Sequence, residues 1–362
     1  MSVLPYLMAL STKLFGAQKF MAKPIPGSTS FPLRIAILAY PGCMGTEIFG
    51  VADVLLIASH IAASLRRARH RPVAVVAVAP FAIEVIGLAG RSVTVAGGLT
   101  VGAQRPSGRY DLLIVPGLEI ARLDEWSTKL APLRRELAFI RKTFASGTGV
   151  AAVCVGTFLL GEAGLLEGRK VTTAWLCAAQ LASRYPGAFL SADAVLVEDG
   201  AVTTTGAVSS AFDLAIHLVK KTLGAEVASA TARVALLPNT RASQAPFVDT
   251  AMLPSSLPAF SQSVAQWLDQ RLEETYDLER LAHAFHVSAR TLLRRVKAQT
   301  GKSPLTLLQQ ARVDKAKQLL NGSNWSVARI TEAVGYADVP TFSRLFASRV
   351  GETPARYRRR QL

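Results

Sequence analysis

The last hundred residues of this chain contain one pattern of apolar and turn residues twice, and this duplication constrains the fold more than any other feature. The first copy comprises Leu278, Leu281, Ala282, Phe285, Val287, Ser288, Leu292, Val296, Gly301 and Pro304. The second comprises Val327, Ile330, Thr331, Val334, Tyr336, Ala337, Phe342, Phe346, Gly351 and Pro354. The offset is 49 residues up to Ala337 and 50 from Phe342 on, so one residue is inserted in the second turn. Each copy predicts a short amphipathic helix, a turn and a second helix, the unit that places a recognition helix in a DNA major groove.

Basic residues are concentrated in the same region. The chain has a formal net charge of +16, from 41 Lys and Arg against 25 Asp and Glu. Residues 280–362 hold 16 of the basic and 4 of the acidic residues, so less than a quarter of the chain carries a net charge of +12. A polyanion is the natural partner of such a block. An acidic membrane surface attracts the same charge, but here the basic residues lie within helical periodicity rather than in a bare polybasic run.

The first predicted helix-turn-helix covers residues 277–297. Ser288 is suited to cap its second helix, whose apolar residues recur four apart and face inward. Arg290, Arg294 and Lys297 share another face of that helix, which donates to guanine edges or to phosphates. The predicted DNA-binding residues of this copy are Ser288, Arg290, Thr291, Arg294, Arg295 and Lys297.

The second predicted helix-turn-helix covers residues 326–348. Phe342, Leu345 and Phe346 form its inner stripe. The outer face is less basic than that of the first copy, so weaker base discrimination is expected from it. The predicted DNA-binding residues of this copy are Pro340, Thr341, Ser343 and Arg344.

One continuous helix is predicted between the two copies. Ser303 at its cap, Pro304 at its first position and an Asn-Gly pair at its end mark its bounds. Such a spacer holds two recognition helices about one DNA turn apart, roughly 34 Å. Its apolar positions are expected to pack against both copies: Leu305, Leu308, Ala316, Leu319 and Leu320. The closing basic run at 356–360 is predicted to bind phosphate through Arg358 and Arg359, which adds affinity more than sequence choice.

Residues 264–360 resemble the DNA-binding domain of the AraC/XylS family of transcriptional regulators. The resemblance rests on the duplicated pattern, on the run AVGYADVPTFSRLF at 333–346 and on the Gly-x-x-Pro at 351–354. It implies that residues 260–362 form an all-α double helix-turn-helix domain that binds promoter DNA. From the residues alone, a pair of solvated basic helices without a nucleic-acid role is the alternative, which two copies in register disfavour.

The preceding residues are of a different kind. A chain of 362 residues that is 50% hydrophobic has room for two domains with cores. From residue 33 on, short runs rich in Val, Ile, Leu and Ala alternate with helical patterns, which predicts an α/β fold with a mostly parallel sheet. Strands are expected at 33–40, 73–79, 111–115 and 149–155, helices at 44–59, 129–145, 156–164, 175–184 and 208–221, and hairpins near 83–101 and 192–206.

Two segments are predicted to lie outside these domains. Residues 1–32 are expected to be a disordered or loosely packed extension that lacks the basic start of a signal peptide, and Met21 is an alternative start. Residues 236–259, with four prolines and several serines, are predicted to form an exposed linker.

Three cysteines fit a reducing cytosol rather than a disulfide scaffold. No apolar stretch is interpreted as long enough to span a bilayer, so a cytoplasmic location without a membrane partner is expected.

The chemical interest of the first domain centres on Cys154. The run GVAAVCVG at 149–156 predicts a strand that turns at Gly156 into a helix. The cysteine would then lie at the carboxyl edge of the sheet, where α/β proteins bind ligands, and a helix N-terminus is expected to lower its pKa. The Thr-Gly pair at 205–206 is expected to direct backbone N–H groups to the same place.

Residues 33–235 resemble the DJ-1/PfpI superfamily, and more closely the sensor domain that regulators of the GlxA type join to an AraC-type carboxyl-terminal half. The matching runs are YPGCMGTE at 40–47, Pro-Gly at 116–117 and LLEGRKVTT at 165–173. The resemblance implies a flavodoxin-like fold, an effector pocket beside the cysteine, and a Glu47 that approaches its thiol. The candidate effector-pocket residues are Cys43, Glu47, Gly117, Cys154 and Val155.

Catalysis is not expected. Enzymes of this superfamily pair the cysteine with a histidine that follows it directly or lies in the loop after the Thr-Thr pair. Here those positions are Val155 and Ala174. Without a base within reach a cysteine nucleophile loses its activation, so no catalytic residue, cofactor or metal is assigned. The domain's histidines are expected to be solvated, for His60 and His70, or packed within a helix, for His217.

Three roles stay open for Cys154: it lines a small-molecule pocket, fills a tight turn as a small apolar residue, or acts as a redox sensor, which needs an accessible thiol of low pKa. Cys177 is expected in the core.

The two resemblances together predict that the chain is a sequence-specific DNA-binding regulator, an activator more than a repressor, whose α/β domain binds an effector. Expected partners are promoter DNA, a small effector of the nitrogenous metabolite class implied by the resemblance, a second copy of the chain and RNA polymerase. The alternatives are a PfpI-type cysteine hydrolase or deglycase tethered to DNA, and a constitutive DNA-binding dimer with a purely structural α/β domain.

Overall fold

The computed structural model describes residues 32–68, 79–122, 125–238, 241, 243–249, 252 and 258–361. The strand predicted at 73–79 lies outside these residues except for its last residue, and so does the extension predicted at 1–32 except for Pro32. The chain divides into two compact units, Met1–Ala242 and Ser243–Leu362. The division falls inside the segment that is predicted to be a linker.

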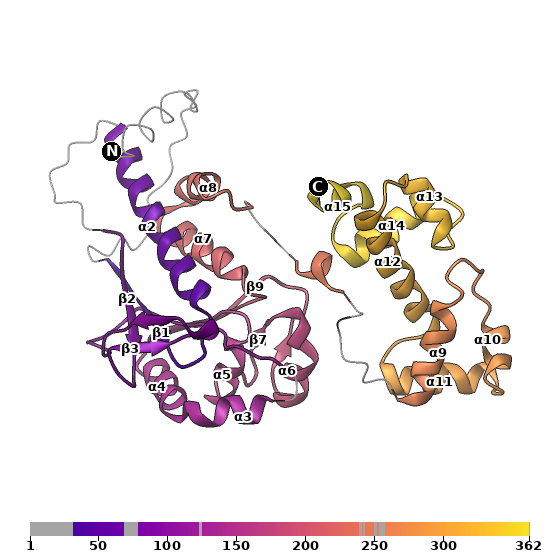
Figure 1. Cartoon of the computed structure of the whole chain (residues 1–362), viewed down its shortest axis with the longest axis horizontal. Coiled ribbons are helices and arrows are strands. Elements are labelled where there is room, and N and C mark those ends of the chain that lie inside the picture. The colour runs from indigo at the N-terminus through magenta and orange to yellow at the C-terminus, as the bar shows by residue number, and fades with distance from the viewer. Residues whose placement is uncertain are drawn as a thin grey trace. The chain divides into compact units, whose positions relative to one another are not determined.

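Among the described residues of the first unit, six strands form one sheet in the order β2-β1-β5-β6-β10-β9 (Figure 1). They are β1 (Leu33–Ala39), β2 (Phe81–Gly87), β5 (Leu112–Val115), β6 (Gly149–Ala152), β9 (Leu196–Asp199) and β10 (Val202–Thr205). Neighbours pair in parallel except β9, which runs antiparallel to β10. The predicted α/β fold with a mostly parallel sheet is confirmed. The direction of strand order reverses between β1 and β5, and ligands bind beyond the carboxyl ends of strands at such switch points.

One strand differs from the prediction of a hairpin near 83–101. Instead, β2 pairs in parallel with β1 along its whole length. Within the described part of this stretch, the antiparallel pair is formed by β3 (Ser92–Thr94) and β4 (Thr100–Gly102). The physical reason is that β2 is a seven-residue run, FAIEVIG, apolar except for Glu84, which finds a larger partner surface in the buried strand β1 than in a three-residue strand. The hairpin predicted near 192–206 is present as β9 and β10.

Helices cover both faces of this sheet. On one face α2 (Gly45–Ala68), α7 (Ser210–Leu223) and α8 (Ala225–Val234) pack together, and α4 (Arg134–Ala145) and α5 (Gly156–Glu162) lie on the other (Figure 1). The shorter elements are α3 (Trp126–Leu130), α6 (Ala178–Arg184), β7 (Lys170–Val171), β8 (Phe189–Leu190) and 3-10 turns at Ala96–Gly98, Ala131–Leu133, Trp175–Cys177 and Ala245–Phe247.

Helix α2 corrects the expectation that no apolar stretch reaches membrane-spanning length. Its segment Gly45–Arg67 contains an 18-residue window with a mean hydropathy of 1.9, and is long and apolar enough by length and composition to cross a bilayer. In the folded unit its inner side packs on β2, α7 and α8 and buries Ile48, Val51 and Leu55. A core helix meets the same criteria, but 39% of this window is buried, and Phe49 and Leu56 on its outer side are 51% and 53% exposed.

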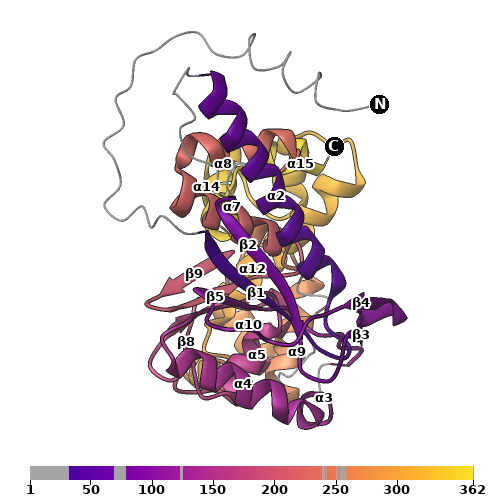
Figure 2. The ribbon, with the colours of Figure 1, turned by 90° about the vertical axis from the view of Figure 1, so that its left-hand side faces the viewer.

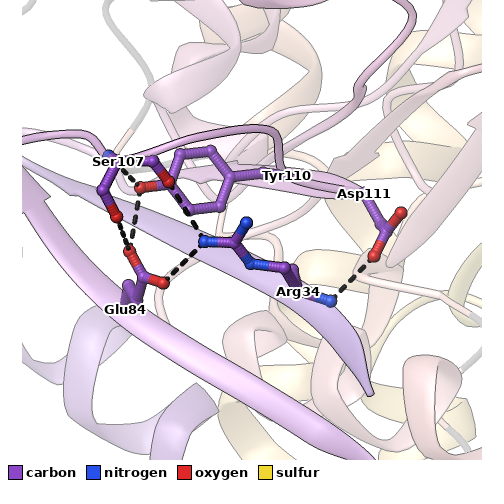
Figure 3. Close-up of polar contacts among 5 residues, drawn as sticks. All are labelled: Arg34, Glu84, Ser107, Tyr110 and Asp111. Carbon is purple, nitrogen blue, oxygen red and sulfur yellow. Dashed lines mark hydrogen bonds and ion pairs between the residues drawn. The ribbon is translucent and has the colours of Figure 1, made fainter. Parts of the chain in front are cut away.

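A polar cluster closes the amino-terminal end of the sheet (Figure 3). Cys154 follows β6 and therefore lies at the carboxyl end of the strands. The Arg34 guanidinium donates to Glu84 Oε1 at 3.0 Å and lies 5.2 Å from the centre of the Tyr110 ring. The Tyr110 and Ser107 hydroxyls donate to Glu84 Oε2 at 2.9 and 3.2 Å. The backbone N–H of Arg34 donates to Asp111 at 2.8 Å. The members satisfy one another, so we interpret the cluster as a structural tie between β1, β2 and the start of β5.

The second unit consists of helices and carries the two predicted helix-turn-helix pairs (Figures 1 and 2). Its helices are α9 (Ala259–Asp269), α10 (Leu278–Ala284), α11 (Ala289–Thr300), α12 (Pro304–Gly322), α13 (Val327–Ala333), α14 (Val339–Val350) and α15 (Pro354–Gln361). Two separate apolar cores hold it together. One joins α9, α10, α11 and the start of α12, and the other joins the end of α12 with α13, α14 and α15.

Helix α12 belongs to both cores, as predicted. Leu308 lies in the first core, and Ala316 and Leu320 lie in the second. The expectation for Leu305 is wrong, because its side chain is 40% exposed. It lies on the turn before Leu308, on the outer side of a helix whose buried stripe starts at Pro304.

The predicted exposed linker is buried in part. Gln244 is 4% exposed, and the turn at Ala245–Phe247 packs against α14. The Lys317 ammonium group on α12 donates to the carbonyl oxygens of Ala245 and Val248. A proline- and serine-rich composition indicates the lack of regular structure, but it does not exclude docking by backbone carbonyls.

Candidate functional site

The turn within each helix-turn-helix has the same backbone conformation at its second residue. His286 in the first copy and Gly335 in the second, which are 49 residues apart, have φ angles of 53° and 76°. A Cβ atom on Gly335 would lie 2.2 Å from the carbonyl oxygen of Leu272, so glycine is required there. His286 adopts the same left-handed conformation at the cost of local strain.

Each recognition helix begins at a capping side chain. Ser288 Oγ accepts a hydrogen bond from the Thr291 N–H at 3.2 Å, which confirms it as the N-cap of α11. In α14 the cap is Asp338, whose Oδ1 accepts from the Thr341 N–H at 2.7 Å. These caps are 50 residues apart, so the inserted residue lies in the second turn as predicted. The α13–α14 turn is therefore one residue longer than its counterpart.

The first recognition helix presents a basic face to solvent. Arg290, Arg294 and Lys297 are exposed, and none of them has a side-chain partner among the residues that the structure describes. Arg295 differs, because its guanidinium lies 3.9 Å from the centre of the Phe260 ring on α9. Thr291 is half-buried and accepts a hydrogen bond from the Ser288 hydroxyl. The free donors of α11 are therefore the three predicted at one helix face.

The second recognition helix presents fewer free donors. Arg344 donates to the carbonyl oxygen of Pro340 and to the Thr341 hydroxyl, both at 3.4 Å. Pro340 and Thr341 are exposed and Ser343 is half-buried. The hydrogen bond from the Thr341 N–H lowers the pKa of the Asp338 carboxyl, which holds a negative charge at the front of α14. This negative charge adds to the difference between the two recognition helices, and the weaker base discrimination predicted for this copy stays a prediction.

The closing basic run has two kinds of arginine. Arg359 is exposed. The half-buried Arg358 turns back toward α12 and donates from Nε to the Leu320 carbonyl oxygen at 3.4 Å. Arg358 therefore helps to satisfy the end of α12, and its assignment to phosphate stays a prediction.

Two buried basic residues on α12 are missing from the sequence-based candidates. Arg312 donates to the carbonyl oxygens of Leu272 and Glu274 at 2.8 and 2.6 Å and stacks on Tyr336, 5.0 Å from its ring centre. It thus ties the segment before the first helix-turn-helix to the turn of the second. Arg312 and Lys317 both interrupt the apolar pattern on the buried face of α12. A basic residue within an apolar helix face is the sequence signal from which their structural role could be predicted.

In the first unit, Cys154 lies in the predicted strand-to-helix turn. It follows β6 with a φ angle of 55°, and α5 begins two residues later at Gly156. A Cβ atom on Gly156 would lie 2.5 Å from the Val115 carbonyl oxygen, so only glycine fits. The Thr173 and Thr157 hydroxyls donate to the Cys154 carbonyl oxygen at 2.9 and 3.2 Å. Adjacent elements hold this strained turn in place.

The Glu47 carboxyl group lies in the same buried environment. Its side chain is 0% exposed, and its Oε2 accepts a hydrogen bond from the Gly117 N–H at 2.6 Å. Its Oε1 has no hydrogen-bond partner within the described part of the chain. Burial raises the pKa of Glu47 to about 8, and the Gly117 hydrogen bond offsets only part of that shift. The carboxyl is therefore protonated at neutral pH.

The expectation that a helix N-terminus lowers the pKa of Cys154 is wrong. Burial and then the nearby Glu47 raise the pKa of its thiol well above the usual value, although the backbone N–H groups of Val155 and Val208 act the other way. Cys154 is 7% exposed. A buried thiol of high pKa is a poor redox sensor, so the first two roles fit the geometry better. The Gly206 N–H, expected to face the same place, donates instead to Val195.

The other candidate pocket residues surround this turn. Gly117 approaches closely enough that a Cβ would lie 3.2 Å from the Cys154 and Val155 side chains. Cys43 is buried, accepts a hydrogen bond from the Tyr40 N–H at 3.4 Å, and has a pKa raised to about 11 by burial. Cys177 is buried, as predicted.

The resemblance to superfamily enzymes singles out two positions at which a histidine is expected. Val155 and Ala174 are both buried. His60 is exposed, as expected. His217 is not packed as expected, because it is half-buried and its Nε2 lies 2.9 Å from Glu198 Oε2. His70 lies outside the described residues.

Comparison with known proteins agrees with this two-part architecture. The DJ-1/PfpI family model matches residues 46–221, and a helix-turn-helix domain model matches residues 281–360. The transcriptional regulator GbdR of Pseudomonas aeruginosa is 27% identical over 225 residues, which cover 61% of this chain and 60% of that protein. The regulator CdhR of the same species is 25% identical over 282 residues, 76% of this chain and 81% of that protein. The chain belongs to the AraC family of regulators that carry a DJ-1/PfpI domain.

Among solved structures, Drosophila melanogaster DJ-1beta aligns with a TM-score of 0.45 and 18% identity, over 57% of this chain and all of that one. The alignment with GbdR spans about three fifths of the length of that regulator. The two family models match separate parts of this AraC-family chain, one in each unit. The predicted family and fold class are confirmed.

Proposed function

We propose that this AraC-family protein regulates transcription by binding promoter DNA through α11 and α14. The observation that carries the proposal is the exposed basic face of Arg290, Arg294 and Lys297 on α11. These donors follow a turn whose conformation recurs 49 residues later. The named relatives are transcriptional regulators, which supports the same function. Cytoplasmic location and RNA polymerase as a partner belong to this proposal.

The test uses the purified full chain and DNA fragments from the region upstream of its own gene. Fluorescence anisotropy should detect binding that weakens steeply with salt, because each neutralised phosphate releases counterions. A specific fragment should bind at least a thousandfold more tightly than a shuffled duplex at the same salt concentration. Equal affinity for both duplexes would reduce the protein to a nonspecific DNA binder, and no binding at low salt would refute the proposal.

The finer part of the proposal concerns control. We expect the chain to exchange between different arrangements of its two units. A small molecule that binds the first unit would shift this equilibrium only if it binds one arrangement more tightly than the other. The sequence predicts the ligand site at the turn that brings Glu47, Gly117 and Cys154 together. The side chains of Glu47 and Cys154 are buried there. Dimerisation through the α/β unit completes the proposal. Thermal unfolding tests ligand binding, since a ligand at a hundred times its dissociation constant adds about 2.7 kcal/mol of stability.

An enzymatic function is not favoured. The raised thiol pKa of Cys154 and the aliphatic residues Val155 and Ala174 oppose formation of a reactive thiolate. The relatives named above support the same conclusion. Turnover of amide or glyoxal-type substrates that depends on Cys154 would overturn it.

A further inference from the structure

One face of α7 lines a cavity of about 620 Å³ together with α8 and the chain that follows α8. Its walls are largely apolar. Phe212 and Ile216 contribute from α7, Ala225 and Ala228 from α8, and Leu237 and Pro238 from the segment after α8. A largely apolar cavity of this size, with a few polar groups, is typical of small-molecule sites. It is distinct from the Cys154 turn, whose residues do not line it.

Most polar groups of this cavity lie along one edge of α7, and Ser229 adds a hydroxyl from α8. Ser209, Asp213, His217 and Lys220 recur at helical spacing, and Arg241 binds the first two of them. The Arg241 guanidinium pairs with both oxygens of Asp213, and it also donates to the hydroxyl and the carbonyl oxygen of Ser209 at 2.9 and 2.8 Å. The Asp213 and Arg241 side chains are 15% and 21% exposed, so this pair is largely shielded.

The charges of the lining do not cancel. Arg241 balances Asp213, and Lys221 and His217 share Glu198. Lys220 lines the cavity and has no partner among the residues that the structure describes. Its ammonium group is therefore the one lining charge left uncompensated, beside an apolar wall.

We propose that this cavity binds a small organic anion with an apolar body and a single carboxylate. The carboxylate pairs with Lys220, and the apolar body lies against Phe212, Ile216 and Pro238. An ammonium-bearing ligand of the same shape would meet Lys220 as a like charge and would be excluded.

The cavity also touches the chain segment that leads to the second unit. Arg241 is separated by one residue from Ser243, where the second unit begins. The next residues are anchored in that unit, because Gln244 is buried and Lys317 holds the carbonyl oxygens of Ala245 and Val248. A ligand that displaces or stiffens the Arg241 anchor would act two residues before the start of the DNA-binding unit. This regulatory consequence rests on the proposed function, whereas ligand binding in the cavity does not.

The binding test uses the full chain and three probes of equal chain length, namely sodium octanoate, octylamine hydrochloride and 1-octanol, measured by isothermal titration calorimetry. Octanoate should bind, and the other two should bind at least tenfold more weakly. Lys220→Met should remove the preference for octanoate. Lys221→Met is the matched control, because this neighbour is paired with Glu198 and does not line the cavity, and it should leave the preference intact.

A second variant, Ser229→Trp, fills the cavity from α8 and should abolish binding of octanoate. The exposed position of Lys220 keeps the first variant informative even if the tryptophan variant does not fold. Equal binding of octanoate and octylamine, or full octanoate binding by Lys220→Met, would overturn the proposal.

The regulatory consequence is tested separately by anisotropy with promoter DNA. Saturating octanoate should change DNA affinity at least threefold in the native protein and not in Lys220→Met. If octanoate binds without changing DNA affinity, the proposed coupling between the cavity and DNA binding is wrong, but the proposal of a ligand site in the cavity stands. Absence of DNA binding in all samples would overturn the proposed function instead, while the calorimetric result stands.

Discussion

Replacing Glu47 by glutamine tests the electrostatics of the cysteine turn directly. Glutamine has the shape of the protonated acid, so its carbonyl oxygen accepts the hydrogen bond from the Gly117 N–H that Glu47 accepts now. It differs from glutamate in having no titratable proton. The substitution therefore removes one ionisation from the folded state without emptying the site.

The expected magnitude follows from the raised pKa. In the folded chain the pKa of Glu47 is about 8, against an ordinary value of 4.5, because burial disfavours the carboxylate. A folded-state pKa above the unfolded value means that the folded state holds the proton between these two pH values while the unfolded state releases it. The free energy of unfolding then falls as pH rises from about 4.5 and levels off above about 8. At 1.36 kcal/mol per pKa unit, the loss is on the order of 5 kcal/mol over the whole range.

The assay is urea unfolding of the native protein and the Glu47→Gln variant at steps from pH 5 to pH 9, followed by tryptophan fluorescence. The difference between their unfolding free energies should favour glutamine progressively with rising pH, because only glutamate pays the ionisation cost. Glu119→Gln, at an exposed carboxylate two residues after Gly117, shows what loss of a surface charge does. A difference that stays constant from pH 5 to pH 9 would refute the assignment of a neutral buried Glu47.

Four further predictions concern the DNA-binding unit. Arg294→Ala should cost about 1–3 kcal/mol of binding free energy at a guanine-bearing position and relax discrimination there, as measured with a series of single-base operator variants. Arg359→Ala should weaken binding to all sequences alike and lower the slope of log affinity against log salt by about one unit, and an effect confined to one sequence would contradict its phosphate role. Gly335→Ala should destabilise the unit by more than about 2 kcal/mol in thermal unfolding, because its Cβ would lie 2.2 Å from a backbone oxygen. His286→Gly, at the equivalent turn position, should instead stabilise by up to about 1 kcal/mol, and the opposite sign would show that the positive φ carries no strain.

Local features of the chain were predictable because their signals are local. The turn spacing, the capping serine at 288 and the outward face of Arg290, Arg294 and Lys297 follow from helix periodicity and capping chemistry. Gly156, two residues after Cys154, likewise marks a strand-to-helix turn that few other residues tolerate. Whether the exposed residues contact DNA stays a prediction.

The failures have a common cause, which is that sequence windows do not show what covers a segment. The composition of α2 alone does not distinguish a core helix from a membrane span, and β2 alone does not reveal its partner strand. The roles of Arg312 and Lys317 depend on carbonyl oxygens that lie 38 to 72 residues away along the chain. Arg358 is drawn back to α12 for the same reason.

The sequence by itself therefore determined the class of protein: a basic duplicated helix-turn-helix unit joined to a parallel α/β unit with a cysteine at the carboxyl edge of its sheet. Periodicity, charge and turn residues are properties of short segments, and they survive without knowledge of the fold. Tertiary structure alone decided the chemical state of the site. Burial around Glu47 and Cys154 raises both pKa values, and desolvation depends on every element that packs around a group rather than on its neighbours in the chain.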